Sequence, residues 1–131
     1  MYADDTASRA LGVTVDSVAP GRATTRMTVT AAMLNGHGIG HGGYVFLLAD
    51  TAFAFACNTY DQRTVAGSCD IDFLDAVRLG DVLVANAVER VRSGRSGIYD
   101  VTVRRGDGSL VAEFRGRCRT IAGTILDGEP L

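Results

Sequence analysis

The segment of residues 44–58 constrains the fold of this chain more than any other. It reads YVFLLADTAFAFACN, is long enough for about four helical turns, and is apolar on nearly every side. A helix of this composition must be buried on all sides, yet its uninterrupted apolar stretches are far shorter than the roughly 20 residues of a membrane span. The sequence therefore predicts a buried central helix in which Asp50 is the single charged residue.

Strand-like runs with alternating apolar and polar residues lie on both sides of this helix. A short helix and two strands joined by the Pro20-Gly21 turn are expected before it, and four strands in meander order after it. The short helix is expected at residues 3–11 and the strands at 12–19, 22–30, 67–73, 82–91, 98–104 and 110–120. These elements predict an α+β domain in which one antiparallel sheet of about six strands wraps around the central helix.

The last of these strands has the clearest alternation. One of its faces is apolar, whereas the other carries Glu113 followed by Arg115, Arg117 and Arg119. The Asp107-Gly108 pair before it gives the strongest hairpin signal, so Arg105-Gly106-Asp107 is interpreted as a strand end and a turn. The arginine row is interpreted as a solvated face that could also meet anionic phosphates.

Composition limits the class of protein. A chain of 131 residues, 47% hydrophobic and 21% charged, fits one soluble globular domain over residues 1–131. A net charge of -2 provides no broad cationic field, so we expect no nucleic acid partner. The first residues contain no apolar run of the kind found in signal peptides, and we expect a cytoplasmic protein. The cysteines are odd in number and lack CxxC spacing, which indicates reduced thiols at Cys57, Cys69 and Cys118.

The residues that lead into the central helix form the sharpest local feature. Residues 35–43 read NGHGIGHGG, and five glycines among nine residues allow the backbone to approach a ligand closely. The first N–H groups of a helix have no intrahelical partner and carry the positive end of its dipole. Gly42 and Gly43 are therefore natural donors to a carbonyl oxygen or an oxyanion. The structural alternative is a flexible loop with a glycine-rich entry to a crowded helix.

Asp50 is a carboxylate midway along a helix that has almost no other polar group. Burying an unpartnered charge is costly, so its presence calls for a reason. One reason is structural, an acid satisfied by a hydroxyl or a backbone N–H. The favoured reason is catalytic, an acid whose apolar surroundings tune it to act as a base or a nucleophile.

Helix geometry predicts where Gly42 and Asp50 can act. They are eight residues apart, which places them roughly 12 Å apart along one helix at about 1.5 Å per residue. One carbonyl group cannot touch both. If both act on it, they must come from different subunits, and an exposed sheet edge and a half-covered helix also favour a homodimer.

Two other patterns carry less weight. Residues 38–43 match GxGxxG and open a helix, but they sit in no βαβ unit, so we do not expect a bound dinucleotide. His37 and His41 are four residues apart, yet the glycines between them argue against a helical metal face and no third ligand is evident. We therefore expect no metal site.

The stretch HGIGHGGYVFLLADTAFAFACN resembles the signature of the hot-dog-fold acyl-coenzyme A thioesterases of phenylacetic acid degradation. The resemblance is strongest over residues 35–58 and looser over 12–120. It implies the hot-dog fold and hydrolysis of an acyl-coenzyme A thioester, with phenylacetyl-coenzyme A or a ring-hydroxylated relative favoured. We expect no cofactor, and a homodimer whose further assembly into a homotetramer is favoured but stays open.

The same resemblance implies roles for individual residues. The backbone N–H of Gly42 points at the thioester oxygen, Asp50 attacks the carbonyl or activates water, and Asn35 helps to place that water. His41 positions the loop and contacts the thioester. Two neighbours complete the implied site as substrate-binding residues, namely Gly43 and Thr51.

The acyl group and two rival functions stay open. An apolar pocket near Phe46, Phe53 or Tyr60 could admit an aryl group, although such aromatic residues are more often plain core. A catalytically silent acyl-coenzyme A sensor and a hot-dog enoyl-coenzyme A hydratase are the alternatives, because fold alone does not fix function. The intact Asp50 argues against the sensor, and the sequence lacks the acid and histidine spacing of the hydratases.

Overall fold

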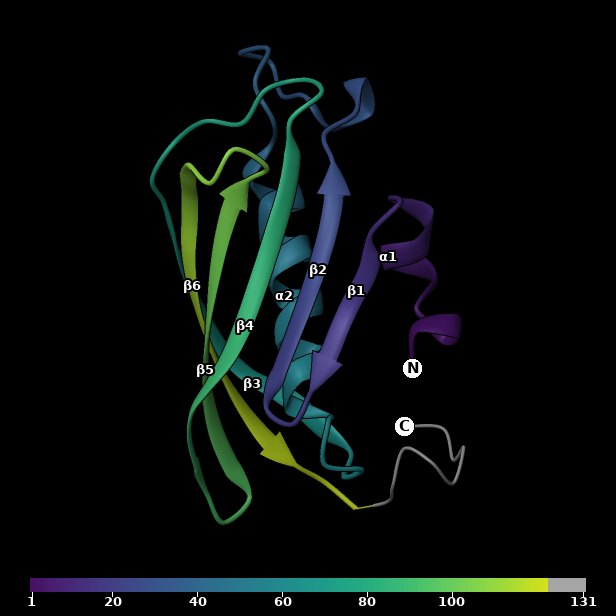
Figure 1. The fold of residues 1–131 in the computed structure, drawn as a ribbon, viewed down its shortest axis with the longest axis vertical. Coiled ribbons are helices and arrows are strands. Elements are labelled where there is room, and N and C mark those ends of the chain that lie inside the picture. Colours follow the sequence, from purple (N-terminus) through teal and green to yellow (C-terminus); the bar gives the residue numbers. More distant parts are fainter. Residues whose placement is uncertain (123–131) are drawn as a thin grey trace.

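A computed structural model describes residues 1–122 as a six-stranded antiparallel sheet that wraps around one long helix (Figure 1). The predicted α+β architecture is thus confirmed. The elements are η1 (Tyr2–Asp4), α1 (Thr6–Ala10), β1 (Thr14–Ala19), β2 (Arg22–Thr28), η2 (Ala31–Met33), α2 (Gly42–Cys57), β3 (Thr64–Phe73), β4 (Val82–Ser93), β5 (Ser96–Arg105) and β6 (Leu110–Thr120).

Helix α2 is the predicted central helix, and it begins two residues earlier than expected, directly after the capping residue His41. Its sheet-facing side chains are fully enclosed, among them Leu48, Ala52 and Phe53. The prediction of burial on all sides is wrong for the single chain, because one sheet curls around only part of the helix. A stripe at helical spacing stays partly or fully exposed, formed by Gly43, Leu47, Asp50 and Ala54.

The strand order differs from the predicted meander. It runs β1-β2-β4-β5-β6-β3, so β3 pairs with β6 and forms one edge of the sheet. Alternation of side chains fixes which face of a strand is buried, but it does not choose the neighbouring strand. The connection of residues 74–81 carries the chain from β3 across the end of the molecule to β4, which pairs with β2 (Figure 1).

Most element boundaries agree with the sequence analysis to within three residues, and β6 agrees at both ends. The expected N-terminal helix is instead two short pieces, η1 and α1. Asp5 separates them because its side chain accepts the Ser8 N–H and caps α1. Within residues 1–122, no helix is long and apolar enough to cross a membrane.

The two faces of β6 behave as alternation predicts. Phe114, Gly116 and Cys118 are buried against α2 and the sheet interior. On the outer face the arginine row is paired rather than simply solvated, since Arg115 binds Asp100 at 2.7 Å and Arg117 binds Asp70 at 2.9 Å. All three cysteines are free, as the sequence indicated.

Gly116 is the position at which this packing can be tested. A Cβ built there would lie 2.6 Å from the ring of Phe53, which is itself only 1% exposed. Gly116→Ala is expected to lower the free energy of unfolding by about 1–3 kcal/mol through overpacking. Denaturant titration at one fixed protein concentration measures this loss.

The matched control is Gly106→Ala, where the nearest atom to an added Cβ is 4.0 Å away. That substitution should leave stability unchanged or raise it slightly, because alanine restricts the unfolded chain. Equal stability of the two variants would contradict the close packing of α2 against β6.

Candidate active site along helix α2

The glycine-rich loop, residues 35–41, is held in one shape by its own polar groups. The Asn35 side-chain oxygen accepts the N–H groups of His37 at 2.9 Å and Ile39 at 3.4 Å. The backbone N–H of Asn35 donates to the Ile39 carbonyl at 2.8 Å, and Gly38 adopts a φ of 74° that favours glycine. The loop is therefore a built turn, and Asn35 is its organising residue.

His41 connects this loop to the helix. Its backbone N–H donates to the Met33 carbonyl at 2.8 Å, and its Nδ1 accepts the Gly43 N–H at 2.9 Å. This contact makes His41 the N-cap of α2 and leaves Nε2 as the nitrogen that carries the proton in the neutral ring. It also occupies the Gly43 N–H, one of the two donors that the sequence singled out.

The Gly42 N–H is the donor that remains. It makes no hydrogen bond within the part of the chain that the structure describes, and it lies at the positive end of the α2 dipole. The ring of Phe73 lies over Gly42, so that an added Cβ would come within 2.9 Å of it. A free, oriented amide beneath an aromatic ring is suited to bind a carbonyl oxygen or an oxyanion.

Asp50 lies two turns further along the exposed stripe of α2. Its carboxylate forms no hydrogen bond or ion pair with the other described residues. Desolvation by burial, followed by the nearby charge of Asp5, raises the pKa of Asp50 above 3.8. An unsatisfied, destabilised carboxylate of this kind can accept a proton from water or attack a carbonyl carbon.

Thr51 has a different neighbourhood from the one that its position beside Asp50 suggests. Its side chain is 6% exposed, donates to the Leu47 carbonyl at 2.8 Å and shares a hydrogen bond of 2.9 Å with the Ser8 hydroxyl. The residue therefore joins α1 to α2 on the flank of the helix. It supports the segment that carries Asp50 and Asp5 rather than opening onto the exposed stripe.

The aromatic residues considered for an acyl pocket separate into three environments. Phe46 is half-buried one turn after Gly42, at 5.3 Å from the Phe114 ring. Phe53 is sealed in the core, whereas Tyr60 lies beyond the far end of α2 and donates to Glu89. Of these three aromatic residues, Phe46 is thus the one placed near the start of the helix.

A model of the family described as "Thioesterase superfamily" matches residues 37–112, which include most of the loop, all of α2, strands β3 to β5 and the start of β6. Acyl-coenzyme A thioesterase PaaI of Escherichia coli (strain K12) is 46% identical over 125 residues, which cover 95% of this chain and 89% of that protein. The chain belongs to the thioesterase superfamily.

Solved structures of other proteins agree with this membership. The E. coli PaaI protein from the phenylacetic acid degradation operon superposes with a TM-score of 0.93, covering 95% of this chain and 90% of that chain at 46% identity. The TT0310 protein from Thermus thermophilus superposes with a TM-score of 0.86 at 41% identity, covering 89% and 98% of the two chains. The sheet wrapped around one long helix is thus the hot-dog fold of this thioesterase family.

Sequence reasoning missed two residues that border the candidate site. Phe73 reads as the last residue of an alternating strand, and only the sheet topology brings its ring over Gly42. Asp5 reads as part of an acidic terminus, although the spacing of Asp5 and Ser8 is a capping signal that could have placed it at a helix start. Among residues 1–122, no cluster of three or more His, Cys, Asp or Glu side chains could hold a metal ion.

The raised pKa of Asp50 predicts a stability effect with a defined sign. Because the folded protein holds the ionised form less favourably than the unfolded chain does, Asp50→Asn is expected to raise the free energy of unfolding at neutral pH. This gain should shrink as the pH falls through the raised pKa toward 3.8, where the carboxyl becomes protonated in both states. Denaturant titrations at about pH 4 and pH 7 measure it, and a gain that grows at low pH would contradict the assignment.

Proposed function

We propose that this protein hydrolyses acyl-coenzyme A thioesters, using Asp50 of one subunit and the Gly42 N–H of another. One observation carries the proposal. The exposed stripe of α2 presents a destabilised carboxylate and the helix start presents an amide, and neither group has a hydrogen-bond partner among residues 1–122. The two groups are too far apart to meet on one helix. The family, and the relative named as an acyl-coenzyme A thioesterase, support the same chemistry.

A two-fold homodimer brings the two groups together. The stripe of Gly43, Leu47, Asp50 and Ala54 is uncovered in the single chain, and among the described strands β3 pairs with β6 alone. A second copy that extends the sheet at β3 would lay the two α2 helices side by side in opposite directions. The middle of each helix would then face the start of its neighbour, giving two sites for each dimer. We propose that such dimers pair into a homotetramer.

The reaction follows from these positions. The thioester oxygen accepts the Gly42 N–H, which stabilises the negative charge that develops as the carbonyl carbon is attacked. Asp50 takes a proton from water, and the resulting hydroxyl adds to the carbonyl carbon. The carbon–sulfur bond then breaks as Asp50 returns the proton to the leaving sulfur, which gives the free acid and coenzyme A thiol and restores the carboxylate. In the alternative route, Asp50 attacks directly and water hydrolyses the mixed anhydride. His41 holds the helix start, and Asn35 shapes the turn beside the water.

The acyl group that we favour is aryl-acetyl, such as phenylacetyl or a hydroxylated relative. Half-buried Phe46 and exposed Phe73 flank Gly42, and both offer aromatic surface to a ring at the carbonyl. The similar E. coli PaaI comes from a phenylacetic acid degradation operon. We place the protein in the cytoplasm, where its three free cysteines would stay reduced.

Asp50→Asn is expected to lower kcat at least about 100-fold, because it keeps the side-chain volume but removes the base. Thiol release from a panel of acyl-coenzyme A esters measures activity, and size-exclusion chromatography checks that assembly is unchanged. Wild-type turnover in this variant would reject the role of Asp50. If the wild-type protein bound acyl-coenzyme A esters without releasing thiol, the result would favour the sensor. Loss of enoyl absorbance would favour the hydratase.

Gly42→Pro removes the proposed oxyanion donor directly. Proline is tolerated at the first position of a helix, and His41 already has the extended backbone that precedes proline well. The expected loss in kcat is about 100- to 1000-fold. Gly42→Ala is the matched control, since it crowds Phe73 in the same way but keeps the N–H, and it should lose far less activity.

Mixing the two inactive proteins tests whether the site is shared. A heterodimer of Asp50→Asn and Gly42→Pro subunits contains one site with both groups intact and one site with neither. Subunit exchange at equal concentrations should therefore restore about a quarter of wild-type activity. No recovery after confirmed exchange would show that each site lies within one subunit.

A further inference from the structure

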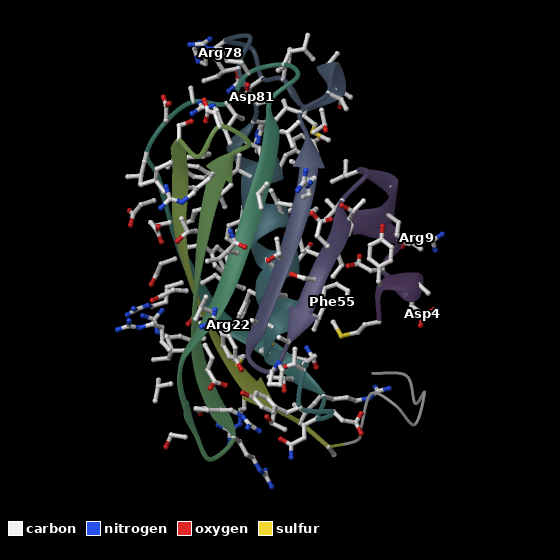
Figure 2. All side chains as sticks on the ribbon, in the orientation of Figure 1. Asp4, Arg9, Arg22, Phe55, Arg78 and Asp81 are labelled. Atoms are coloured by element: carbon white, nitrogen blue, oxygen red, sulfur yellow. The ribbon has the colours of Figure 1, made fainter. Side chains whose placement is uncertain are left out.

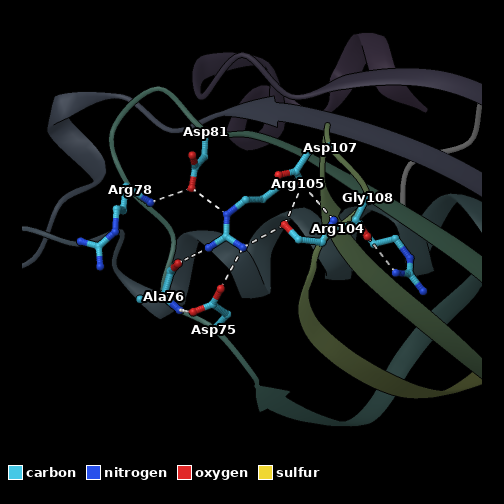
Figure 3. Close-up of polar contacts among 9 residues, drawn as sticks. Asp75, Ala76, Arg78, Asp81, Arg104, Arg105, Asp107 and Gly108 are labelled. Atoms are coloured by element: carbon cyan, nitrogen blue, oxygen red, sulfur yellow. Dashed lines mark hydrogen bonds and ion pairs between the residues drawn. The ribbon is translucent and has the colours of Figure 1, made fainter.

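The Arg105 side chain, at the end of β5, is the centre of a polar network that holds the connection of residues 74–81 (Figure 3). Its Nε donates to Asp81 at 3.1 Å, and its Nη1 donates to Asp75 at 3.0 Å. Its Nη2 donates to the Ala76 carbonyl, and its Nη1 also reaches the Ser109 hydroxyl at 3.2 Å. One guanidinium thus joins both ends of the connection to the β5–β6 hairpin.

Charge reinforces these contacts. The side chain of Arg105 is only 17% exposed, and Asp81, then Asp75, raise its pKa above the ordinary value. The pKa of Asp81 is lowered because its carboxylate accepts the Arg78 N–H and binds Arg105. Because one planar guanidinium binds two carboxylates and a carbonyl at once, it holds the 74–81 connection in a fixed position relative to β5.

Val77, in the middle of the 74–81 connection, contacts Gly40 of the glycine-rich loop. The Val77 carbonyl accepts the Gly40 N–H at 2.7 Å, and a Cβ on Gly40 would lie 2.2 Å from the Val77 side chain. Val77 is itself 3% exposed, so this contact is closed to water. Phe73, just before the connection, lies over Gly42. Before His41, the chain therefore contacts the segment that Arg105 holds, and after His41, Gly42 contacts the residue that directly precedes this segment.

The network lies close to the start of helix α2. Arg78 and Asp81 lie at the end of the molecule where α2 begins (Figure 2). The proposed reaction depends on the direction of one N–H group at that helix start, and displacement of a reacting group by about 1 Å can cost about 100-fold in rate. No residue of the network needs to touch substrate to affect that direction.

We infer that Arg105 is a positioning residue for the oxyanion donor: by fastening residues 74–81 it fixes Val77 against Gly40, and so fixes the Gly42 N–H. This inference rests on the proposed function for its consequence in catalysis. The structural part stands by itself, because the Gly40–Val77 hydrogen bond exists in the free protein and can be observed without substrate.

Arg105→Gln and Arg105→Lys test the inference, with Arg104→Gln as the matched control. Arg104 is the neighbouring residue on the same strand, carries the same charge, and binds only the Gly108 carbonyl within the described chain. Arg105→Gln should lower kcat about 10- to 100-fold with a smaller change in KM, because it affects the transition-state contact more than binding. The kcat of Arg105→Lys should lie between those of Arg105→Gln and the wild type, and the kcat of Arg104→Gln should stay within about two-fold of the wild-type value.

Amide hydrogen exchange gives a readout that does not depend on activity. In Arg105→Gln the Gly40 amide should exchange at least about ten-fold faster relative to the Val101 amide, which lies in the buried centre of β5. A general loss of stability would speed both amides equally, and that result would overturn the inference. Unchanged Gly40 exchange, or equal kcat in Arg105→Gln and Arg104→Gln, would overturn it too. A wild-type protein without thioesterase activity would reject the proposed function, while Gly40 exchange would still decide the role of Arg105 in the loop.

Discussion

The enclosure of one apolar helix by a single sheet is the constraint on which the rest of this structure depends. A sheet of six strands can curl around most of α2 but not around all of it, so one stripe of the helix stays open. A helix stripe that faced water permanently would ordinarily carry polar residues. Here it carries glycine, leucine and alanine around one carboxylate, which is the composition of a contact surface.

In the proposed reaction the same helix supplies both the oxyanion donor and the base, because its start and its middle differ in electrostatic character. The start exposes amide dipoles that favour negative charge. The His41 cap uses one of these amides and leaves the Gly42 amide without a partner in the described part of the chain. The middle holds a carboxylate against poorly hydrated surroundings and the charge of Asp5. In the proposed dimer, the substrate carbonyl bound at the start of one helix would face the carboxylate in the middle of the other helix.

Much of this could be predicted from the sequence, since the informative signals are local. The length and apolarity of α2, the turn glycines and the alternation in β6 each follow from neighbouring residues, and the lone acid is visible by its contrast with them. What could not be predicted depends on contacts between distant segments. The pairing of β3 with β6, the ring of Phe73 over Gly42, and the network of Arg105 join residues that no periodicity connects.

Strand β3 illustrates how such a distant pairing also shapes the order of assembly. It follows α2 directly in the chain, but it pairs with β6, whose first residue comes 37 positions after Phe73. During synthesis the segment must wait unpaired until nearly the whole domain has emerged, and pairings of this long range are slow to form. The edge proposed for contact with a second copy is therefore completed last, and until β6 arrives both edges of the β3 segment are open to pairing with other chains.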